Sequence, residues 1–411
     1  MQNSICQLAS KIQKIKNFFH LLWAVLANIY YQFPSRRLKV IGVTGTDGKT
    51  TTTHLIYHIL KSAGKKVSLI STVYAKVGNQ EFDTGLHTTT PGPFFIQRFL
   101  KRAADSGDQF FVLETTSHAL DQNRVWGVKY EIGVITNITH EHLDYHQTYE
   151  EYVKTKLKLL KMAKIALVNK DDQSYRYIKD KISNISYPYK ISKIIREIPG
   201  LAKFNQYNYS AAYFVCKQLG VSDEVILKAM KSFKLPSGRM ELVYDGSFKV
   251  LIDFAHTPNA FAQILPEVRM RYLRKGGKLI HVFGAAGLRD FSKRPLMGEV
   301  SGKFADMIII TEEDYRTEDL YKICQQIGVG IAKQGIKLVD EKFFERNDDK
   351  IYTIITNRQK AINKAIKIAK KGDVILITGK AHEKSLCRGK IEYPWDEYKA
   401  VKKALKIYKL L

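Results

Sequence analysis

Cysteine is scarce in this sequence: its 411 residues include only Cys6, Cys216, Cys324 and Cys387. The four positions lie far apart and form no Cys-x-x-Cys pair, so the sequence has neither the spacing of a zinc site nor that of a disulfide framework. We therefore expect reduced thiols, no structural zinc and a cytoplasmic protein.

Acidic residues are also in short supply, because 40 Asp and Glu stand against 66 Lys and Arg and give a formal net charge of +26. Such an excess indicates anionic partners: nucleotides, phosphorylated metabolites, nucleic acid or an acidic membrane surface. The lysines are spread through nearly every predicted helix and form no aromatic-rich patch. We interpret most of them as solvated and expect no nucleic-acid binding.

The first 37 residues lack an apolar run long enough to cross a membrane. The apolar stretch Phe18–Tyr31 is shorter than the roughly 18 residues of a spanning helix, and it contains His20 and Asn28. A signal peptide is an alternative interpretation, which the Gly-Lys-Thr motif at 48–50, directly behind the stretch and typical of a nucleotide-binding domain, disfavours. We predict that residues 1–37 form a helical extension that either lies on a membrane surface, through residues 18–31, or packs on the next domain.

Strand and helix patterns alternate through the rest of the chain, which is 45% hydrophobic and long enough for two or three domains. Strand-like runs before residue 236 are Leu38–Val43, Val67–Ser71, Gln109–Leu113, Ile132–Thr136 and Ile165–Val168, and helical periodicity covers Thr50–Leu60, Phe94–Ala104, Tyr149–Met162 and Asn208–Leu219. After the turn-rich Leu-Pro-Ser-Gly at 235–238, strand-like runs follow at Phe248–Asp253, Lys278–Phe283, Asp306–Thr311 and Asp373–Thr378. The pattern predicts an α/β protein with a central P-loop ATPase domain at 38–235, built on a mostly parallel sheet, and a C-terminal Rossmann-like α/β domain at 236–411.

A strand-to-helix turn carries the clearest chemical motif. It reads Gly45, Thr46, Asp47, Gly48, Lys49, Thr50 and Thr51. The two glycines let backbone N–H groups surround phosphate oxygens, Lys49 adds a positive charge, and the Thr50 hydroxyl can bind Mg²⁺. The strict pattern has a glycine five residues before Gly48, where this chain has Val43, so the motif is a variant. It predicts ATP and Mg²⁺ as cofactors.

Polar residues gather where two predicted strands end. The run from Gln109 ends in Glu-Thr-Thr-Ser-His at 114–118, and the run from Ile132 is followed by residues 136–146, which include three histidines. Ligands collect at the carboxyl ends of parallel strands. A carboxylate and an imidazole placed there, beside a phosphate loop, are candidate Mg²⁺ ligands.

A set of ordered motifs resembles the Mur ligase family, from about Leu38 to the C-terminus. They are Gly-Thr-Asp-Gly-Lys-Thr-Thr-Thr at 45–52, His-Thr-Thr-Thr-Pro at 87–91, Glu-Thr-Thr-Ser-His-Ala-Leu at 114–120, His-Leu-Asp-Tyr-His at 142–146, Phe-Asn-Gln-Tyr-Asn at 204–208, Gly-Arg-Met-Glu at 238–241, Asp-Phe-Ala-His-Thr-Pro at 253–258, Lys-Arg-Pro-Leu-Met-Gly at 293–298 and Gly-Lys-Ala-His-Glu at 379–383. Within the family they are most similar to the branch that adds the third amino acid to the peptide of a peptidoglycan precursor.

The resemblance implies an ATP-dependent, ADP-forming amide ligase and gives roles to single residues. Lys49 would bind the ATP phosphates and Thr50 one Mg²⁺, while Glu114, His142 and a carbamylated Lys156 would serve a second Mg²⁺ and catalysis. Without the resemblance, Lys156 looks like an ordinary solvated lysine between Lys154 and Lys158. The resemblance also assigns Asn205 to adenine, Arg239 and Asp253 to ATP, and Thr89, Thr90, Thr116, Gln122 and Arg124 to a UDP-N-acetylmuramyl-dipeptide-like acceptor.

The incoming amino acid would be bound, on the same resemblance, by Arg289, Glu313, Asp314, Arg316, Gly379 and Glu383. Arg316 favours diaminopimelate, because arginine grips a second carboxylate. Asp314 stands where the diaminopimelate pattern has an asparagine, and its negative charge would suit the amine of lysine instead. We expect diaminopimelate ahead of lysine.

Two expectations remain open. Members of this family usually begin with a uridine-nucleotide domain of about 100 residues, and the stretch 1–37 is too short for one. Either the basic extension and the central domain bind the diphosphate end, or the acceptor is not a uridine nucleotide. A monomer is expected, and the rival functions are a folylpolyglutamate- or cyanophycin-type ligase and a non-catalytic nucleotide-binding protein recruited to an anionic surface.

Overall fold

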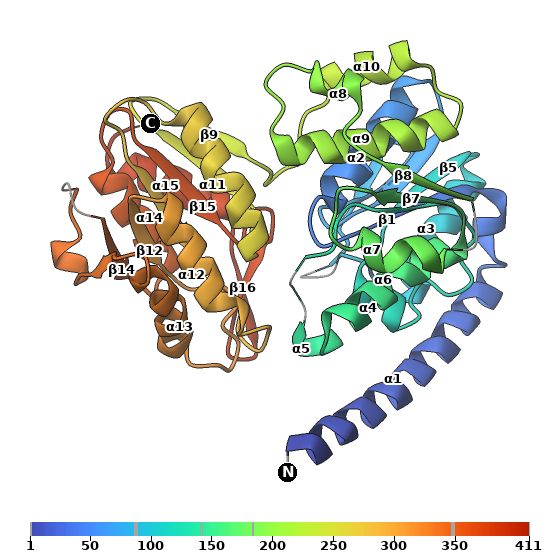
Figure 1. The fold of residues 1–411 in the computed structure, drawn as a ribbon, viewed down its shortest axis with the longest axis horizontal. Coiled ribbons are helices and arrows are strands. Elements are labelled where there is room, and N and C mark those ends of the chain that lie inside the picture. Colours follow the sequence, from blue (N-terminus) through green and yellow to red (C-terminus); the bar gives the residue numbers. More distant parts are fainter. Residues whose placement is uncertain are drawn as a thin grey trace. The chain divides into compact units, whose positions relative to one another are not determined.

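The chain forms two compact units (Figure 1), which are described separately. The structure is a computed structural model that describes residues 2–85, 89–139, 141, 143–182, 185–346 and 350–410. Unit 1 comprises Met1–Thr139 and His146–Pro236, and unit 2 comprises His140–Tyr145 and Ser237–Leu411.

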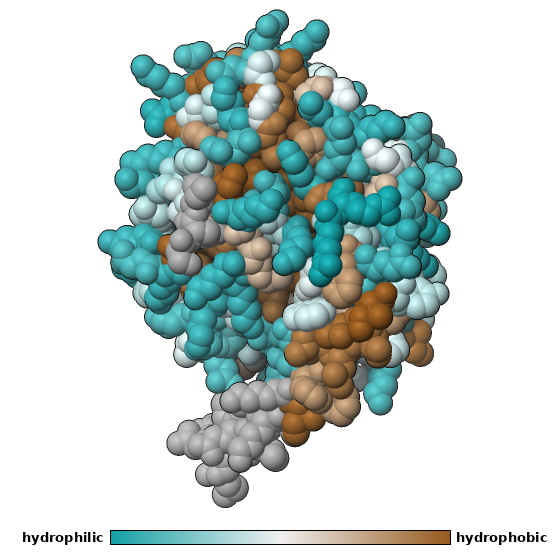
Figure 2. Space-filling model, turned by 90° about the vertical axis from the view of Figure 1, so that its right-hand side faces the viewer, coloured by the Kyte–Doolittle hydropathy of each residue, from teal (hydrophilic) through white to brown (hydrophobic). Residues whose placement is uncertain are grey.

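A long helix opens unit 1. Helix α1 spans Gln2–Tyr30, which starts well before the predicted apolar stretch, and a short 3-10 helix, η1, follows at Pro34–Arg37. The C-terminal half of α1 packs against α3 (Pro93–Asp105). Figure 2 shows the other side of α1 as a continuous brown, hydrophobic band next to the grey N-terminal residues. Among the described residues, no helix has both the length and the apolar character needed to cross a membrane.

An eight-stranded sheet forms the centre of unit 1, with the order β4-β3-β2-β5-β1-β6-β7-β8. The strands are β1 (Lys39–Thr44), β2 (Val67–Ile70), β3 (Ala75–Val77), β4 (Gln80–Phe82), β5 (Phe110–Glu114), β6 (Tyr130–Ile135), β7 (Ala163–Asn169) and β8 (Ile185–Tyr189). The strands from β2 to β8 along this order pair in parallel, and only β3 and β4 are antiparallel additions.

Helices cover both faces of this sheet, which explains why its strands are nearly continuous apolar runs. On β1, Ile41 and Val43 belong to a core shared with α2, α9 and α10, whereas Val40 faces the core formed with α3. The helices of unit 1 after α1 are α2 (Lys49–Ser62), α3, α4 (Ser117–Asp121), α6 (Tyr149–Met162), α7 (Tyr175–Ile178), η2 (Lys179–Lys181), α8 (Lys193–Arg196), α9 (Lys203–Gln218) and α10 (Asp223–Ser232), while α5 (Leu143–His146) has only its last residue in unit 1.

Unit 2 is built on a seven-stranded sheet with the order β13-β14-β12-β11-β15-β10-β9, parallel except for β9. The strands are β9 (Glu241–Asp245), β10 (Lys249–Asp253), β11 (Leu279–Phe283), β12 (Met307–Ile310), β13 (Lys337–Leu338), β14 (Ile351–Ile354) and β15 (Val374–Thr378), and β16 (Ser385–Arg388) and β17 (Ile391–Pro394) form a separate hairpin. The helices are α11 (Pro258–Tyr272), α12 (Lys293–Phe304), α13 (Leu320–Ala332), η3 (Glu341–Phe343), α14 (Arg358–Ile368) and α15 (Glu397–Ile407). The predicted fold class, two α/β units with mostly parallel sheets, is confirmed.

Candidate functional site

The glycine turn between β1 and α2 has a backbone that only glycine supports without strain. Gly48 has a φ of 80° and lies directly before α2. A Cβ at Gly48 would overlap Oδ1 of Asn208, and one at Gly45 would overlap the Thr136 hydroxyl. The turn therefore lies directly against neighbouring polar side chains. The N–H groups at the start of α2, which lack partners within the helix, can bind an anion.

Neighbouring loops hold the turn in place. The Asp47 N–H donates to Oδ1 of Asn137 at 2.9 Å, and the Thr46 N–H donates to the Asn137 carbonyl at 2.8 Å. Lys49 Nζ donates to the Thr46 carbonyl at 2.7 Å, so the lysine folds back over the turn. These contacts give the loop a defined shape before a nucleotide binds.

The carboxylate of Glu114 lies beside the start of α2. It is 1% exposed at the end of β5, and its Oε1 accepts a hydrogen bond from the Thr50 hydroxyl at 2.9 Å. Thr72, at the end of β2, donates to the same carboxylate through both its hydroxyl and its N–H, each at 2.9 Å. Thr51 is also buried in the first turn of α2.

This oxygen-rich arrangement fits a Mg²⁺ ion, because hydroxyl and carboxylate oxygens are the ligands that a hard cation prefers. His142, the other predicted metal ligand, lies outside the described residues. Within the described residues, no three His, Cys, Asp or Glu side chains are grouped as metal ligands. Thr50 and Glu114 would therefore hold the ion together with phosphate oxygens and water.

Lys156 is buried, so the interpretation of Lys156 as an ordinary solvated lysine is wrong. Its side chain is 1% exposed, and Nζ donates to the Gly45 carbonyl at 2.6 Å and lies 4.6 Å from the centre of the Tyr152 ring. Its neighbours Lys154 and Lys158 are exposed. The helical period of α6 turns Lys156 toward the phosphate loop and the other two lysines toward solvent.

A buried histidine lies next to this lysine. His146 Nε2 is 3.0 Å from the Ser117 hydroxyl. Burial, followed by the nearby charges of His118 and Lys156, lowers the pKa of His146 to about 3. The imidazole is therefore neutral at physiological pH, and it adds no positive charge beside Lys156.

The predicted adenine contact, Asn205, lies on α9 behind the phosphate loop. Asn205 and Asn208 are buried, and Nδ2 of Asn208 donates to Oδ1 of Asn205 at 3.1 Å. Asn208 also lies against Gly48, where it leaves no room for a Cβ. Helix α9 therefore contacts the phosphate loop through Asn208, the residue that is hydrogen-bonded to Asn205.

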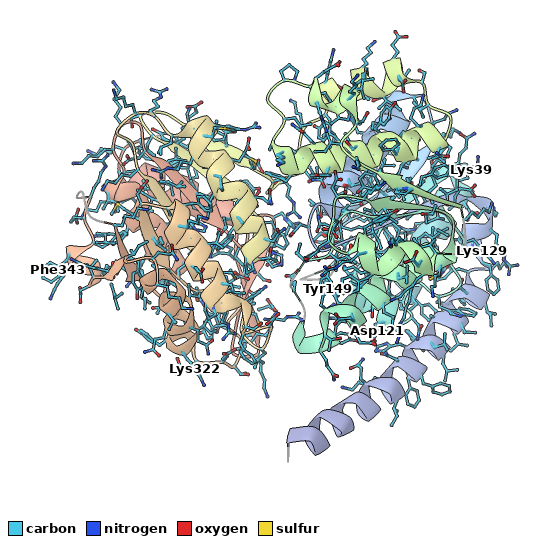
Figure 3. All side chains as sticks on the ribbon, in the orientation of Figure 1. Lys39, Asp121, Lys129, Tyr149, Lys322 and Phe343 are labelled. Carbon is cyan, nitrogen blue, oxygen red and sulfur yellow. The ribbon has the colours of Figure 1, made fainter. Side chains whose placement is uncertain are left out.

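The five predicted acceptor-binding residues come from three segments of unit 1. Thr89 and Thr90 precede α3, Thr116 lies between β5 and α4, and Gln122 and Arg124 follow α4, whose last residue, Asp121, is labelled in Figure 3. Thr90 joins two of them, because its hydroxyl accepts from the Thr116 N–H at 2.9 Å and its carbonyl accepts from Arg124 at 2.8 Å. Gln122 Oε1 accepts from Nε of Arg124 at 2.9 Å, and Thr89 accepts from the Thr72 hydroxyl at 3.2 Å. The Thr90 hydroxyl also donates to the Glu114 carbonyl at 2.9 Å. These five residues, which we call the acceptor group, thus lie next to Glu114.

In unit 2, two predicted ATP contacts lie at the start of the domain. Asp253, at the end of β10, accepts from the N–H groups of Met240 and Ala255, both at 2.7 Å. The guanidinium of Arg239 lies 5.0 Å from the centre of the Phe254 ring. Burial raises the pKa of Asp253, while Arg239 opposes that rise.

Asp314 is the counter-ion of a buried lysine. Its two carboxylate oxygens lie 2.9 and 3.0 Å from Nζ of Lys380, which is 0% exposed, and Oδ1 also accepts from the Cys387 N–H. Glu383 accepts from the same Nζ. Burial alone would lower the pKa of Lys380, but Glu383 and Asp314 raise it overall. In the structure, the charge of Asp314 is therefore paired with a protein side chain.

Glu313, next to Asp314, has a carboxylate oxygen without a protein partner among the described residues. The residue is 7% exposed, its Oε2 is buried, and a Cβ added at Gly379 would lie 2.6 Å from it. Burial has the largest effect on the pKa of Glu313 and raises it. The charge of His256 has the next largest effect and lowers this pKa. This oxygen lies beside the glycine of the Gly-Lys-Ala-His-Glu motif.

The two predicted arginines differ in their surroundings. Nη1 of Arg316 donates to the carbonyls of Gly287 at 2.8 Å and Asp314 at 3.2 Å, and the residue has a φ of 53°. Arg289 is exposed on the loop after β11. Arg316 is thus tied to the Gly287 loop, and Arg289 is an exposed residue of that same loop.

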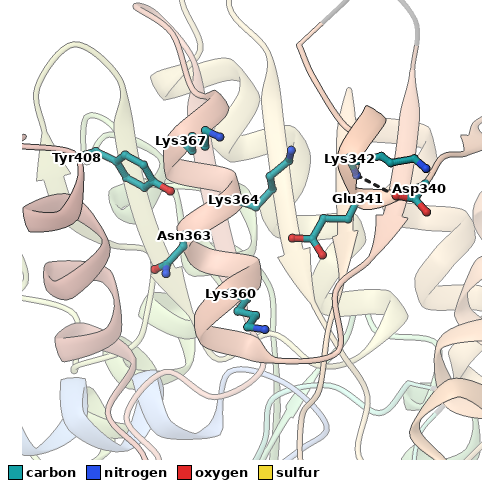
Figure 4. Close-up of a pocket in the computed structure, with 8 residues that line it drawn as sticks. All are labelled: Asp340, Glu341, Lys342, Lys360, Asn363, Lys364, Lys367 and Tyr408. Atoms are coloured by element: carbon teal, nitrogen blue, oxygen red, sulfur yellow. Dashed lines mark hydrogen bonds between the residues drawn. The ribbon is translucent and has the colours of Figure 1, made fainter.

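A separate pocket in unit 2 contains none of the predicted site residues (Figure 4). It lies between η3 and α14 and is lined by Asp340, Glu341, Lys342, Lys360, Asn363, Lys364, Lys367 and Tyr408. Lys342, Lys360 and Lys367 are exposed, whereas the side chain of Lys364 is 11% exposed and pairs with Glu345 at 3.1 Å.

Several residues around the site were not assigned from the sequence. Thr72 and Lys380 are the most important, because they hold Glu114 and Asp314 respectively. Thr72 directly follows the predicted strand Val67–Ser71, so the strand-end rule that selected Glu114 would have found it. Lys380 lies inside the Gly-Lys-Ala-His-Glu motif, and Glu383 is one of its partners, but the sequence does not show its pairing with Asp314, which is 66 positions away.

Two family models match the chain. Residues 43–194 match the Mur ligase middle domain, and residues 238–381 match the model described as Mur ligase, glutamate ligase domain. The chain is 38% identical to UDP-N-acetylmuramoyl-L-alanyl-D-glutamate--2,6-diaminopimelate ligase of Aquifex aeolicus (strain VF5), over 92% of this chain and 80% of that protein. It is 35% identical to UDP-N-acetylmuramyl-tripeptide synthetase of Roseiflexus sp. (strain RS-1), over 93% of this chain and 81% of that protein.

Solved structures give the same fold. The structure of a UDP-N-acetylmuramoyl-L-alanyl-D-glutamate--2,6-diaminopimelate ligase matches this chain with a TM-score of 0.56 and 26% sequence identity. The match covers 90% of this chain and 79% of the chain of that ligase. A folylpolyglutamate synthase of Mycobacterium tuberculosis has a TM-score of 0.67 and covers 88% of this chain and 93% of its own. Its identity is only 13%, so this second likeness is one of fold alone.

Proposed function

The chain belongs to the Mur ligase family, and on that basis we propose that it is an ATP-dependent, ADP-forming amide ligase of peptidoglycan precursor synthesis. Its acceptor is a UDP-N-acetylmuramyl-dipeptide or a closely similar muramyl peptide, and the amino acid that it adds is diaminopimelate, with lysine second. The observation that carries the proposal is the continuous hydrogen-bonded set in unit 1, in which Glu114 connects Thr50 of the phosphate loop to Thr90 of the acceptor group.

The reaction begins with transfer of the terminal phosphoryl group of ATP to the acceptor carboxylate, which gives an acyl phosphate and ADP. The N–H groups around Gly48 and the ammonium of Lys49 stabilise negative charge on the phosphates. Bound Mg²⁺, held by Thr50 and Glu114, supplies further charge neutralisation. Thr90, Thr116 and Arg124 orient the acceptor so that its carboxylate lies near the phosphoryl group.

The second step is attack of the amino group of the incoming amino acid on the acyl phosphate, which forms the amide and releases phosphate. In this proposal Glu313 receives an ammonium of the amino acid and Arg316 a carboxylate. The buried, partner-free oxygen of Glu313 supports this assignment. Lys380, Asp314 and Glu383 keep the loops on either side in position.

Lys156 acts close to the phosphates in either of two forms. As an ammonium, it holds the Gly45 carbonyl in place. Carbamylation would convert it to a carboxylate-like group that no longer repels Mg²⁺. A mass increase of the intact protein in bicarbonate, lost in Lys156→Arg, would identify the carbamylated form.

The location proposed is the cytoplasm, where ATP is available. The described cysteines support it, because Cys216, Cys324 and Cys387 are free thiols. A reducing compartment preserves this state.

The test is an assay of ADP release by the purified chain. Release should require both the muramyl-dipeptide and a diamino acid, and the product mass should show which amino acid was added. Lys49→Ala should abolish release. ATP hydrolysis that is indifferent to both substrates would refute the ligase assignment, and a product formed only from a folate or a polyaspartate acceptor would assign a different ligase.

A further inference from the structure

Helix α1 packs on unit 1 with its small residues and exposes its large apolar ones. Ala24, Ala27 and Asn28 are each 0% exposed and face the domain. On the opposite side are Phe18, Phe19, Leu22, Trp23, Leu26 and Ile29, which we call the α1 stripe, with 44–63% of each side chain exposed. Their spacing of three and four residues places them on one face of the helix.

The contacts on the inner side fix this orientation. Asn28 Nδ2 donates to the Trp126 carbonyl at 2.7 Å and to the Ala24 carbonyl at 2.9 Å. Asn17 Nδ2 donates to Asp121 Oδ2 at 2.9 Å, and the Asn17 carbonyl accepts from Asn123 at 3.3 Å. Turning the stripe inward would break these hydrogen bonds and place bulky rings where alanines now fit.

A contiguous exposed apolar face of this size indicates a binding surface. Each large apolar side chain gains stability when it leaves water, so six on one face give a strong tendency to be covered. Trp23 extends the surface onto α3, because its ring centre lies 4.9 Å from that of Phe94.

The charges around the stripe indicate what covers it. Helix α1 contains no acidic residue. Lys16 on α1 and Arg36 in η1 are exposed, and so is Lys129, whose N–H donates to the Ser35 hydroxyl at 3.1 Å and which Figure 3 labels.

The nearest carboxylates do not offset these cations, because both already form ion pairs. Asp105 pairs with Arg37 and Lys101, each at 2.9 Å, and Asp121 pairs with Lys158 at 3.3 Å. An apolar face with Trp, Phe and Leu, bordered by Lys and Arg, is the pattern of a helix that lies in the interface of an anionic bilayer.

We propose that α1 binds the surface of an anionic lipid bilayer, parallel to its plane, with the α1 stripe inserted among the acyl chains. The helix also contacts the segment from Asp121 to Asn123, which contains Gln122 of the acceptor group. Bilayer binding therefore places the acceptor group of unit 1 beside the lipid surface. The proposal goes beyond the ligase function and stands on the geometry of α1 alone.

Co-sedimentation with vesicles tests it. The full chain should sediment with vesicles of equal parts phosphatidylglycerol and phosphatidylcholine, and much less with phosphatidylcholine alone. The double variant Phe19→Ser/Leu26→Ser should bind the mixed vesicles at least about tenfold more weakly, because it removes two inserted side chains. Raising the salt concentration should weaken wild-type binding, since exposed charges are screened.

A matched control uses apolar side chains that are equally exposed elsewhere. Met270 on α11 and Val329 on α13 are 72% and 56% exposed. The variant Met270→Ser/Val329→Ser should sediment like the wild type. Equal binding of the stripe variant and the wild type, or weaker binding of the control variant alone, would overturn the proposal.

Two further measurements separate the lipid from other occupants. Trp fluorescence should shift to shorter wavelength when the mixed vesicles are added, and Trp23→Phe should remove that shift. In light scattering without lipid, the wild type and the stripe variant should have the same mass. A dimer that the stripe substitutions dissolve, with no vesicle binding, would overturn the proposal in favour of a second copy of the chain. ADP release by the stripe variant with soluble substrates should equal that of the wild type, so failure of the ligase assignment and failure of bilayer binding are distinguishable.

Discussion

At the residue scale, the chemistry of this protein depends on charges that are buried and held by neighbours. Glu114 is almost inaccessible, yet it accepts hydrogen bonds from Thr50 and Thr72. A carboxylate held in this way keeps its position without rearrangement when charge develops on the phosphates.

The substitution Glu114→Gln tests that role, because glutamine keeps the shape and an accepting oxygen but loses the charge. We expect the kcat for ADP release to fall by about 10²-fold or more and the Mg²⁺ concentration for half-maximal activity to rise. The measurement is a Mg²⁺ titration of the ligase assay. Glu150→Gln on the exposed side of α6 is the control. An unchanged Mg²⁺ requirement would show that Glu114 does not hold the ion.

The adjacent acids Glu313 and Asp314 should behave differently when each is neutralised. Asp314→Asn should destabilise the protein by about 2–3 kcal/mol, because it weakens a buried ion pair while Glu383 still neutralises Lys380. Glu313→Gln should leave stability nearly unchanged but raise the KM for the amino acid about tenfold or more. Urea unfolding and steady-state kinetics measure the two effects. A stable Asp314→Asn variant with an altered amino-acid preference would contradict the structural role of Asp314.

At the element scale, the turn between β1 and α2 brings the phosphate-binding N–H groups together, and its shape depends on glycine. Two glycines with the same φ of 80° provide a comparison. A Cβ added at Gly48 would overlap Asn208, whereas a Cβ added at Gly220 would meet no atom within 4 Å. Replacing either by alanine adds the strain of a positive φ, which costs about 1 kcal/mol. Only the replacement at Gly48 also displaces Asn208 and the loop.

We therefore expect Gly48→Ala to raise the KM for ATP at least tenfold and Gly220→Ala to leave it unchanged. Nucleotide binding measured by calorimetry gives the same comparison without turnover. Equal losses in the two variants would mean that backbone strain, not the shape of the loop, controls nucleotide affinity.

At the scale of the whole molecule, buried neutral histidines make stability depend on pH in both units. Burial is the main cause that lowers the pKa of His146 in unit 1 and of His281 in unit 2 to about 3. The unfolded chain binds a proton on each near pH 6.5, so between pH 6.5 and pH 3 the unfolded state holds more protons than the folded state. Their contribution to stability is complete above pH 6.5 and decreases as the pH falls.

As the pH is lowered from 6.5 to 5, we expect the free energy of unfolding to decrease by about 2 kcal/mol for each of the two histidines. Thermal unfolding at several pH values measures the loss. His281→Gln should flatten the dependence, because glutamine does not titrate, while its hydrogen bonds to Ser301 and Thr378 are partly retained. A pH dependence that is equally steep in this variant would assign the loss to other groups.

The amino-acid sequence by itself determined the alternation of strands and helices, the phosphate loop and the family. Buried strands and amphipathic helices have their own periods, so β1 and β5 were predicted to within a residue or so. The sequence-based prediction did not include the edge strands β3 and β4, and it started α9 too late, because short edge strands and polar helix starts carry little periodic signal.

Only the tertiary structure decided which charged side chains face solvent and which face a partner. Lys154, Lys156 and Lys158 look alike in sequence, and packing of α6 against the phosphate loop buries just one of them. Asp314 and Lys380 are neutralised by each other across 66 positions, and α1 turns its alanines inward. The physical reason is that a local pattern records which residues can be buried, whereas the energy of a charge or an apolar face depends on neighbours that the folded chain brings from elsewhere.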